Sequence, residues 1–188
     1  MTSMKKLIFE PTPLSGAYLI HPNSFEDERG SFSRVFCKEE FADIFKGDIA
    51  QINHSVTLKK GTVRGMHFQY SPYAEIKMVK CIKGSVFDVI VDIRQNSKTF
   101  LQWFGAVLSV KNRTMIFIPE GFAHGFQTLE DDTELLYMHS ELYTPHHEGA
   151  LNALDPMLHI SWQLPISSIS QRDKSHPMLQ SDFQGLVL

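Results

Sequence analysis

The sequence predicts an all-β fold: an antiparallel sandwich or barrel of short strands with a few short helices. From residue 51 onward, short segments rich in β-branched and aromatic residues follow one another, separated by Lys, Gly and Pro turn signals. From residue 51 to the C-terminal tail a helical period is nearly absent. The chain has 188 residues without a repeat or an evident linker, a length that suits one domain with a sizeable core. We therefore expect a single domain over residues 1–188.

The first 36 residues are typical of an extended arm. Residues 1–23 contain three prolines and a short apolar run, which favours an edge strand or an arm. Residues 31–36 alternate between apolar and polar positions and predict a further extended segment. Residues 38–45 carry an apolar stripe at helical spacing, with Gly47 as the stop, so they predict the main early helix.

The remaining strands are predicted from alternation. In the segment 86–93, the odd-numbered residues from Phe87 to Ile93 share one face, while Asp88, Ile90 and Asp92 share the other. Residues 165–188 read as a tail of loop with one short helix. The full set of strands expected after residue 50 is 52–58, 64–69, 78–82, 86–93, 103–110, 115–118, 125–129 and 134–139.

The composition is that of an ordinary globular protein and excludes some classes of partner. Hydrophobic residues make up 43% and charged residues 21%, and the net charge is -3, so the basic surface that binds nucleic acid is not expected. A small anionic ligand remains possible. Cys37 and Cys81 have no metal-type spacing and predict reduced thiols in a cytoplasmic protein. The apolar run 7–9 is too short for a signal peptide, and no run has the length of a membrane span.

The most informative short stretch is 64–69, which reads RGMHFQ. In an extended segment Arg64, Met66 and Phe68 share one face, and the other face carries His67 and Gln69. An imidazole and an amide need hydrogen-bond partners when they are buried, so this face predicts a polar site rather than packed core. A half-exposed strand with a solvated polar face is the simpler alternative.

Two segments resemble the signature segments of the cupin superfamily, whose members are small jelly-roll barrels. Gly61 precedes a strand histidine, His67, and a Pro-x-Gly-x-x-His turn ends at His124 some fifty residues later. The metal-binding cupins place a second histidine two positions after the first, where this chain has Gln69. His67 and His124 are candidate ligands, but no third ligand stands at the expected place, so we expect no metal.

A metal-free barrel with inward polar groups predicts acid–base chemistry. A histidine side chain can accept a proton, and His67 is the candidate for this role. Lys77 begins a strand that then turns apolar, and an inward ammonium is costly unless it meets an anion. Tyr137 can supply a proton from the opposite side. The simpler alternatives are a solvated strand-end lysine at Lys77 and a core aromatic at Tyr137.

Six segments in order resemble the dTDP-4-dehydrorhamnose 3,5-epimerase family of nucleotide-sugar enzymes. Each segment alone is a weak signal, but the set is specific, and the resemblance runs from about residue 10 to residue 180. The segments are DERG at 27–30, QIN at 51–53, RGMHFQ at 64–69, KMVKC at 77–81, VDIR at 91–94 and PEGFAHGF at 119–126.

The resemblance implies cofactor-free epimerisation of a 4-keto-6-deoxy sugar carried on a nucleoside diphosphate. By family match, His67 is the base that removes a proton next to the ketone, and Asp173 holds its imidazole in the right tautomer. Tyr137 delivers a proton to the other face of the sugar, and Lys77 stabilises the enolate oxygen. His124 lines the sugar site.

The resemblance also implies a binding site for the nucleotide and a homodimer. The family's dimers exchange N-terminal strands, so Arg29 is expected to serve the neighbouring subunit's site. Arginine suits the diphosphate through its planar fork, and Tyr143 offers a stacking surface for the base. The binding residues implied are Arg29, Gln51, Asn53, Arg64, His124, Tyr143, Glu148 and Arg172.

Three positions depart from the family pattern. Ile52 stands where many members have an acidic or polar residue, Arg34 where some have Glu, and Ala153-Leu154 where a Trp-containing segment is usual. The catalytic set is retained, so these departures leave open the nucleotide, the sugar, and whether C3, C5 or both are inverted. A single-centre epimerase, a metal-dependent cupin and a non-catalytic sugar-nucleotide binding module are the alternatives.

Overall fold

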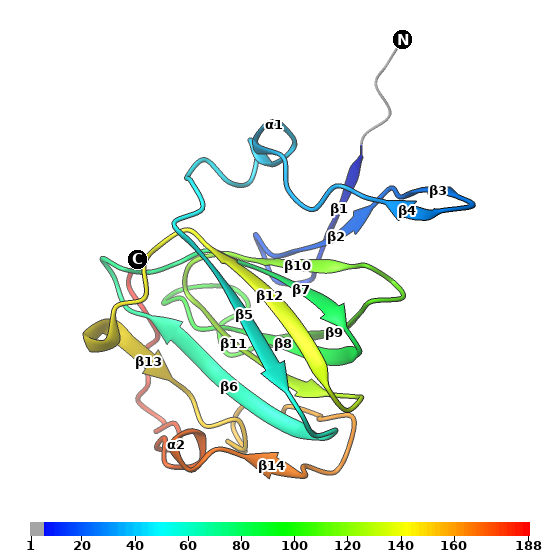
Figure 1. The fold of residues 1–188 in the computed structure, drawn as a ribbon. Coiled ribbons are helices and arrows are strands. Elements are labelled where there is room, and N and C mark those ends of the chain that lie inside the picture. Colours follow the sequence, from blue (N-terminus) through cyan, green and yellow to red (C-terminus); the bar gives the residue numbers. More distant parts are fainter. Residues whose placement is uncertain (1–5) are drawn as a thin grey trace.

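The structure, a computed structural model of the chain, describes residues 6–188 and consists mainly of two antiparallel sheets (Figure 1). The first five residues of the expected arm lie outside the described residues. The first sheet has the order β1 (Leu7–Pro11), β2 (Tyr18–Pro22), β10 (Met115–Ile118), β7 (Lys77–Lys83), β12 (Thr133–His139) and β5 (Gln51–Thr57). The second has the order β13 (Glu148–Ala150), β6 (Thr62–Gln69), β11 (Phe122–Thr128), β8 (Ser85–Asp92) and β9 (Trp103–Ser109), with β14 (Ser168–Ile169) pairing in parallel with β6.

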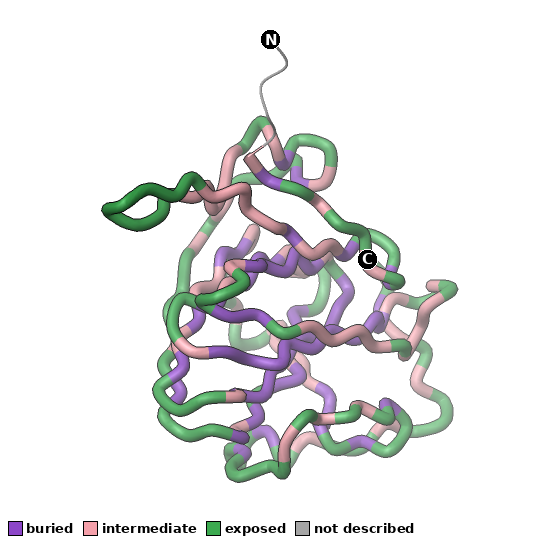
Figure 2. The backbone as a smooth tube through the Cα atoms, turned by 90° about the vertical axis from the view of Figure 1, so that its right-hand side faces the viewer, coloured by how far each residue is buried: buried purple, intermediate pink, exposed green. Residues whose placement is uncertain are grey.

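Apolar side chains form three layers around these sheets, and Figure 2 shows buried backbone running through the centre of the molecule. The middle layer lies between the sheets and includes Val79, Ile90 and Leu135. A second layer lies where the chain after β13 covers the second sheet, and a third where the helix α1 (Lys38–Phe41) covers the first sheet. Burial of these faces holds the two sheets together as the predicted sandwich.

The two faces of strand β8 pack in different layers, as the alternation of residues 86–93 predicts. Its residues are buried on both faces. Val89 and Val91 pack in the layer beneath the C-terminal chain, whereas Ile90 packs between the sheets. Asp88 has the same parity as Ile90 and therefore points into the interior.

A β-bulge between β6 and β11 changes which side chains of β6 share a face. His67 pairs with His124 and Arg64 pairs with Phe126, so three steps on β6 match two steps on β11. The extra residue reverses the alternation between Arg64 and His67. The expectation that Arg64 faces away from His67 is therefore wrong, because the bulge turns both toward the same side.

Two further details of the N-terminal third differ from expectation. The helix predicted over 38–45 is a single turn, α1, followed by turn residues 42–44. Phe41 and Phe45 are both buried against the first sheet, so their apolar character reflects tertiary packing and not a longer helix. The strand predicted over 31–36 ends at residue 32. The other helices are the 3₁₀ turn η1 (Pro145–His147) and α2 (Gln171–Lys174), the short helix expected in the tail.

Strands β3 (Phe25–Asp27) and β4 (Gly30–Phe32) form a two-stranded ribbon that projects from the body of the molecule (Figure 1). All six of these residues are exposed, as Figure 2 also shows. An isolated hairpin of this length has little stability of its own in water. Within residues 6–188, no helix is long and apolar enough to cross a membrane.

Candidate active site

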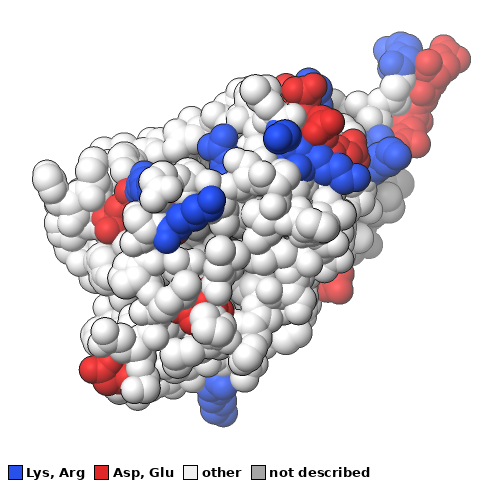
Figure 3. All heavy atoms as spheres, turned by 90° about the horizontal axis from the view of Figure 1, so that it is seen from below, with Lys and Arg blue, Asp and Glu red and all other residues white. Residues whose placement is uncertain are grey.

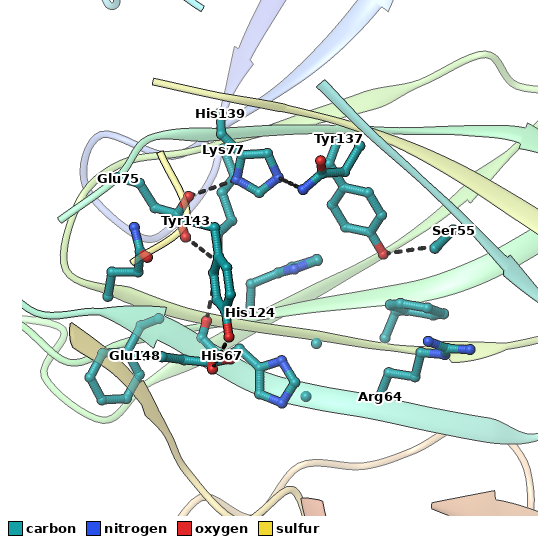
Figure 4. Close-up of a pocket in the computed structure, with 16 residues that line it drawn as sticks. Ser55, Arg64, His67, Glu75, Lys77, His124, Tyr137, His139, Tyr143 and Glu148 are labelled. Carbon is teal, nitrogen blue, oxygen red and sulfur yellow. Dashed lines mark hydrogen bonds and ion pairs between the residues drawn. The ribbon is translucent and has the colours of Figure 1, made fainter. Parts of the chain in front are cut away.

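A cavity of about 300 Å³ opens between β5, β7 and β12 of one sheet and β6 and β11 of the other (Figure 4). It continues the space between the sheets beyond the apolar core. Figure 4 shows His67 on one wall and Tyr137 on the opposite wall, with His124 between them and Lys77 to one side, beside Glu75 and His139. The predicted residues in its lining are Asn53, Arg64, His67, Lys77, His124, Tyr137, Tyr143 and Glu148.

His67 and Asp173 form a hydrogen-bonded pair at one wall of the cavity. His67 Nε2 lies 3.0 Å from Asp173 Oδ1, and the backbone N–H of Gly65 donates to Asp173 Oδ2 at 3.3 Å. Burial alone raises the pKa of Asp173, but hydrogen bonding and charge from His67 outweigh it, and the net pKa lies below the usual value. The carboxylate therefore holds the proton on Nε2 and leaves Nδ1 of His67 with a free lone pair.

The C-terminal chain brings Asp173 to this position through short local structure. Strand β14 pairs with the start of β6, and Ile169 is buried in the same apolar layer as Val63. Ser170 then caps α2, since its side chain accepts the backbone N–H of Asp173 at 3.0 Å. The pairing and the cap together deliver the carboxylate to His67.

Tyr137 is a protonated phenol on the opposite wall. Burial raises its pKa strongly, and the hydroxyl of Ser55 donates to the phenolic oxygen at 3.4 Å. The nearby charge of Arg64 acts in the opposite direction, favouring the phenolate. Tyr137 thus carries a proton at neutral pH and has two neighbours that would stabilise its anion.

Lys77 enters the cavity from the first residue of β7 with its ammonium group paired. Its Nζ lies 3.0 Å from Glu75 Oε1 and donates to the backbone carbonyl of His67 at 3.4 Å. The Lys77 side chain is 10% exposed. A solvated strand-end lysine, the simpler alternative, does not describe this arrangement.

His124 stands beside the centre of the cavity and is bound to a buried carboxylate. Its Nε2 lies 2.9 Å from Asp88 Oδ2 and 3.1 Å from Oδ1. Burial raises the pKa of Asp88 in spite of this contact. The ring of His124 also meets Tyr137 edge to face, with centroids 6.1 Å apart.

A group of polar side chains surrounds Tyr143 at the edge of the cavity. The Tyr143 hydroxyl donates to Glu148 Oε2 at 2.8 Å, and the Arg172 guanidinium pairs with the same oxygen. Gln51 does not line the cavity but accepts the backbone N–H of Tyr143 at 2.9 Å. Gln69 accepts the N–H of Thr144 at 2.7 Å, so the amide that replaces the second cupin histidine anchors this loop.

Arg29 lies away from the cavity of its own chain. It sits on the β3–β4 ribbon, pairs with Asp27 at 2.5 Å, and its side chain is 84% exposed. Of the three departures from the family pattern, Arg34 pairs with Glu40 at 2.7 Å, and Ile52 is exposed on β5. None of these residues lines the cavity.

The third departure is in the chain that covers the second sheet. Ala153 is buried in the apolar layer there, and its carbonyl accepts the indole N–H of Trp162 at 3.0 Å. Leu154 is 47% exposed. Neither residue belongs to the cavity lining.

One group of side chains among the described residues has the spacing to hold a metal ion. Ligand atoms of His67, Asp173 and His176 lie within 4.8 Å of one another. The partner of His67 in this group is His176, not the predicted His124, whose Nε2 is bound to Asp88. These are the residues that could hold a cation in this part of the chain.

The structure adds Ser55, Glu75, Asp88 and His139 to the residues expected at the site. Asp88 had a signal in the sequence, because it shares the inward face of its strand with Ile90. Glu75 precedes β7 in a loop without periodicity, and His139 ends a strand, so neither had a pattern that pointed inward.

Comparison with known proteins agrees with this geometry. The family model described as dTDP-4-dehydrorhamnose 3,5-epimerase matches residues 11–181. The chain belongs to the dTDP-4-dehydrorhamnose 3,5-epimerase family. The predictions of the family, of its cupin-type jelly-roll fold and of an isomerase are therefore confirmed.

Three relatives show how close this epimerase-family chain is to characterised proteins. It is 38% identical to a dTDP-4-dehydrorhamnose 3,5-epimerase of Sinorhizobium fredii over 95% of this chain and 92% of the relative. A Legionella pneumophila 3,5-epimerase solved with dTDP-4-keto-L-rhamnose has a TM-score of 0.88 and 32% identity, covering 97% of this chain and 99% of that one. A Streptomyces bikiniensis 3'-monoepimerase solved with dTDP-quinovose has a TM-score of 0.83 and 33% identity, covering 90% and 86%.

Proposed function

We propose that this member of the family epimerises a nucleoside-diphosphate 4-keto-6-deoxy sugar without a cofactor. The substrate we assign is dTDP-4-dehydro-6-deoxyglucose and the product dTDP-4-dehydrorhamnose. The observation that carries the proposal is the placement of a base and an acid on opposite walls of one cavity. His67, oriented by Asp173, lies across the cavity from Tyr137, and the Lys77 side chain enters the cavity beside Glu75 (Figure 4).

The reaction assigned to these groups conserves atoms and charge at each step. Nδ1 of His67 takes a proton from the carbon next to the ketone, and the C–H electrons move into the carbonyl to give an enolate. The Lys77 ammonium stabilises the enolate oxygen, a contribution typically worth about 3–4 kcal/mol of barrier. The Tyr137 hydroxyl then protonates the carbon from the opposite face, which inverts the centre. Solvent afterwards takes the extra proton from His67 and returns one to Tyr137.

The remaining polar residues suit the nucleotide. Arg64 is turned into the cavity by the bulge in β6 and offers its planar guanidinium to the diphosphate. Asn53 lines the cavity beside His139. Tyr143 provides a ring for the base at the mouth, and Glu148 and Arg172 fix that ring in place.

We infer that the active protein is a homodimer in which the β3–β4 ribbon completes the partner's site. The ribbon carries Arg29 away from its own cavity and is fully exposed in a single chain. A short ribbon of this kind gains stability when it packs against a second copy.

The free thiols Cys37 and Cys81 fit a reducing compartment, and we assign the protein to the cytoplasm.

Proton exchange in heavy water tests the proposed reaction. The purified protein is mixed in catalytic amount with dTDP-4-keto-6-deoxyglucose in heavy water and followed by proton NMR. We expect loss of the signals at C3 and C5. If no signal is lost with this substrate or with CDP- and GDP-linked 4-keto sugars while the nucleotide still binds, the proposal is wrong and the protein is a binding module.

A single-centre epimerase is the second candidate, and the likeness to the Streptomyces bikiniensis 3'-monoepimerase supports it. The same spectra distinguish the two. Loss of one signal with retention of the other identifies a single-centre enzyme. Loss of both, followed by appearance of the doubly inverted sugar, identifies a 3,5-epimerase.

A further inference from the structure

Glu75 is a buried carboxylate in the cavity wall that the proposed reaction does not use. Its side chain is only 8% exposed. Its Oε1 lies 3.0 Å from Lys77 Nζ, and its Oε2 lies 2.6 Å from His139 Nδ1. Figure 4 shows the three side chains together at one end of the cavity. Burying a charge is costly unless partners compensate it, and Glu75 has one on each oxygen.

His139 is oriented by a second contact on its far side. Asn53 Nδ2 lies 3.4 Å from His139 Nε2. An amide nitrogen donates, so Nε2 accepts, and the proton of the neutral ring is on Nδ1, where it is donated to Glu75. Burial raises the pKa of Glu75, but His139 and Lys77 outweigh it and the net pKa is lowered, so Glu75 stays ionised.

The direction of the Lys77 ammonium depends on this carboxylate. Lysine has a flexible four-carbon stem, and its head can point in several directions unless a partner fixes it. The other contact of Lys77 is the longer one, 3.4 Å to a backbone carbonyl. Removal of the Glu75 charge would weaken the shorter of the two contacts that hold the ammonium in the cavity.

We propose that Glu75, itself oriented by His139, is the positioning residue that holds the Lys77 ammonium where the enolate oxygen forms. The inference rests on the proposed epimerase reaction for its catalytic consequence, but the link between Glu75 and Lys77 stands on the geometry alone. Glu75 and His139 act through Lys77 and need not touch the sugar. A structural role for the same carboxylate would lower stability without selectively slowing proton removal.

The chain contains a matched control for this arrangement. On the outer side of the first sheet, Glu134 lies 3.4 Å from Lys83 Nζ and 3.0 Å from His54 Nε2. This is the same Lys–Glu–His combination, but Glu134 does not line the cavity. Glu134→Gln therefore removes the same charge from the same kind of cluster away from the site.

The first experiment compares the steady-state rates of proton exchange in the wild type, Glu75→Gln and Glu134→Gln. We expect Glu75→Gln to lower kcat by about 10- to 100-fold, the cost of displacing a catalytic group by about 1 Å. KM should change by less than about threefold, because the contact is needed chiefly in the transition state. Glu134→Gln should match the wild type. Equal kcat values for Glu75→Gln and the wild type would overturn the proposal.

Two further variants separate positioning from structural support. His139→Gln should slow exchange less than Glu75→Gln, and the double variant should be no slower than Glu75→Gln alone, because His139 acts through Glu75. Glu75→Asp keeps the charge and should recover part of the lost kcat. Additive losses, or a Glu75→Asp variant as slow as Glu75→Gln, would contradict the proposal. If Glu75→Gln fails to bind dTDP, its fold is impaired. The kcat values of Glu75→Asp and His139→Gln, each compared with the wild type, then test the proposal.

A spectroscopic readout makes the test independent of activity. A buried, hydrogen-bonded ammonium exchanges its protons slowly, so the ¹⁵N-edited signal of the Lys77 side chain should be visible in the wild type and in Glu134→Gln. It should be lost in Glu75→Gln. An unchanged Lys77 signal in Glu75→Gln would show that Glu75 does not position the ammonium. A wild type that shows this signal but exchanges no sugar proton would instead refute the proposed function and leave the Glu75–Lys77 link intact.

Discussion

The surroundings of His67 and Tyr137 suit these two residues to the different tasks that the proposed reaction gives them. Asp173 fixes the tautomer of His67, so the proposed base presents the same nitrogen to the cavity. Tyr137 has no carboxylate partner and keeps its proton through burial, with Ser55 beside its oxygen. Proton removal and proton return can therefore be impaired separately.

Tyr137→Phe should uncouple exchange from inversion. The phenyl ring keeps the packing against His124 but has no proton to give. We expect the sugar protons to exchange with heavy water through His67 while little inverted product forms. Proton NMR of the exchanged sugar, compared with a Ser55→Ala variant that keeps the phenol, provides the measurement. Normal inversion by Tyr137→Phe would exclude Tyr137 as the acid.

Asp173→Asn should slow proton exchange by about a hundredfold, the lower end of what general base catalysis contributes, because the imidazole loses its orienting carboxylate.

The same variant gives a prediction about stability. The pKa of Asp173 is lower in the folded protein than its ordinary value of 3.8. Its contribution to stability is therefore complete above pH 3.8 and is lost as the pH falls through the lower folded-state pKa.

Urea unfolding over a range of pH measures this contribution. The difference in the free energy of unfolding between the wild type and Asp173→Asn should be largest near neutral pH and should shrink below pH 3.8. Aspartates elsewhere in the chain titrate in both proteins and cancel from the difference. A difference that stayed constant down to low pH would show that the Asp173 charge does not stabilise the fold.

At the scale of elements, the bulge between β6 and β11 depends on two glycines that leave no room for a side chain. A Cβ on Gly65 would lie 2.5 Å from the Cα of Gly125. A Cβ on Gly125 would lie 2.5 Å from Met66 Sδ. The strands can approach this closely because both positions lack a side chain. The bulge in turn brings Arg64 to the same face as His67.

Gly65→Ala should therefore be far more damaging than a glycine substitution with the same backbone conformation. Gly65 and Gly30 both have φ +132, but a Cβ on Gly30 meets nothing within 4 Å. The two alanine variants share the backbone strain and differ in packing. We expect Gly65→Ala to unfold at lower urea concentration, with a loss of about 1–3 kcal/mol beyond that of Gly30→Ala. Equal losses would show that the close approach of β6 and β11 is not required.

The elements that could be predicted from the sequence are those defined by local alternation. The strands from residue 51 to residue 139 follow the period of two, and the segment 86–93 even had its faces assigned correctly. The position of Arg64 could not be predicted in this way, because a bulge depends on the partner strand. The helix predicted over 38–45 was too long. Phe41 and Phe45 are both buried in one apolar layer, but a turn after Phe41 places Phe45 there, and the apolar spacing in the sequence looks the same for a turn as for a longer helix.

The site residues followed the same division. His67, Lys77 and Tyr137 lie on strands within recognisable segments, and the structure places them around one cavity. Glu75 and His139 meet only because the loop before β7 folds against the end of β12. No short segment of the sequence contains both, so their pairing required the assembled sheet.

At the scale of the whole molecule, the surface carries charges of both signs. The face in Figure 3 shows Lys and Arg beside Asp and Glu rather than one continuous basic surface. The projecting ribbon has the same mixture, with Arg29 next to Asp27. Charges of both signs at the ribbon are compatible with the proposed association of two copies through matched charges.

Mixing two inactive variants tests whether the ribbon serves the partner's site. His67→Ala removes the base, and Arg29→Ala removes the expected diphosphate contact. In a mixed dimer with exchanged ribbons, one site carries both changes and the other carries neither. Random mixing should then restore about a quarter of wild-type activity at a substrate concentration where both parents are nearly inactive. No recovery would show that Arg29 acts within its own subunit or not at all.

The His67–Asp173 pair joins residues that are 106 positions apart, and its second member lies close to the end of the chain. A ribosome makes the strands that line the cavity before it makes residue 173, so in a nascent chain the proposed base exists before the carboxylate that orients it. The protein therefore reaches its full proposed activity only after the segment that carries Asp173 has been made and has packed beside β6.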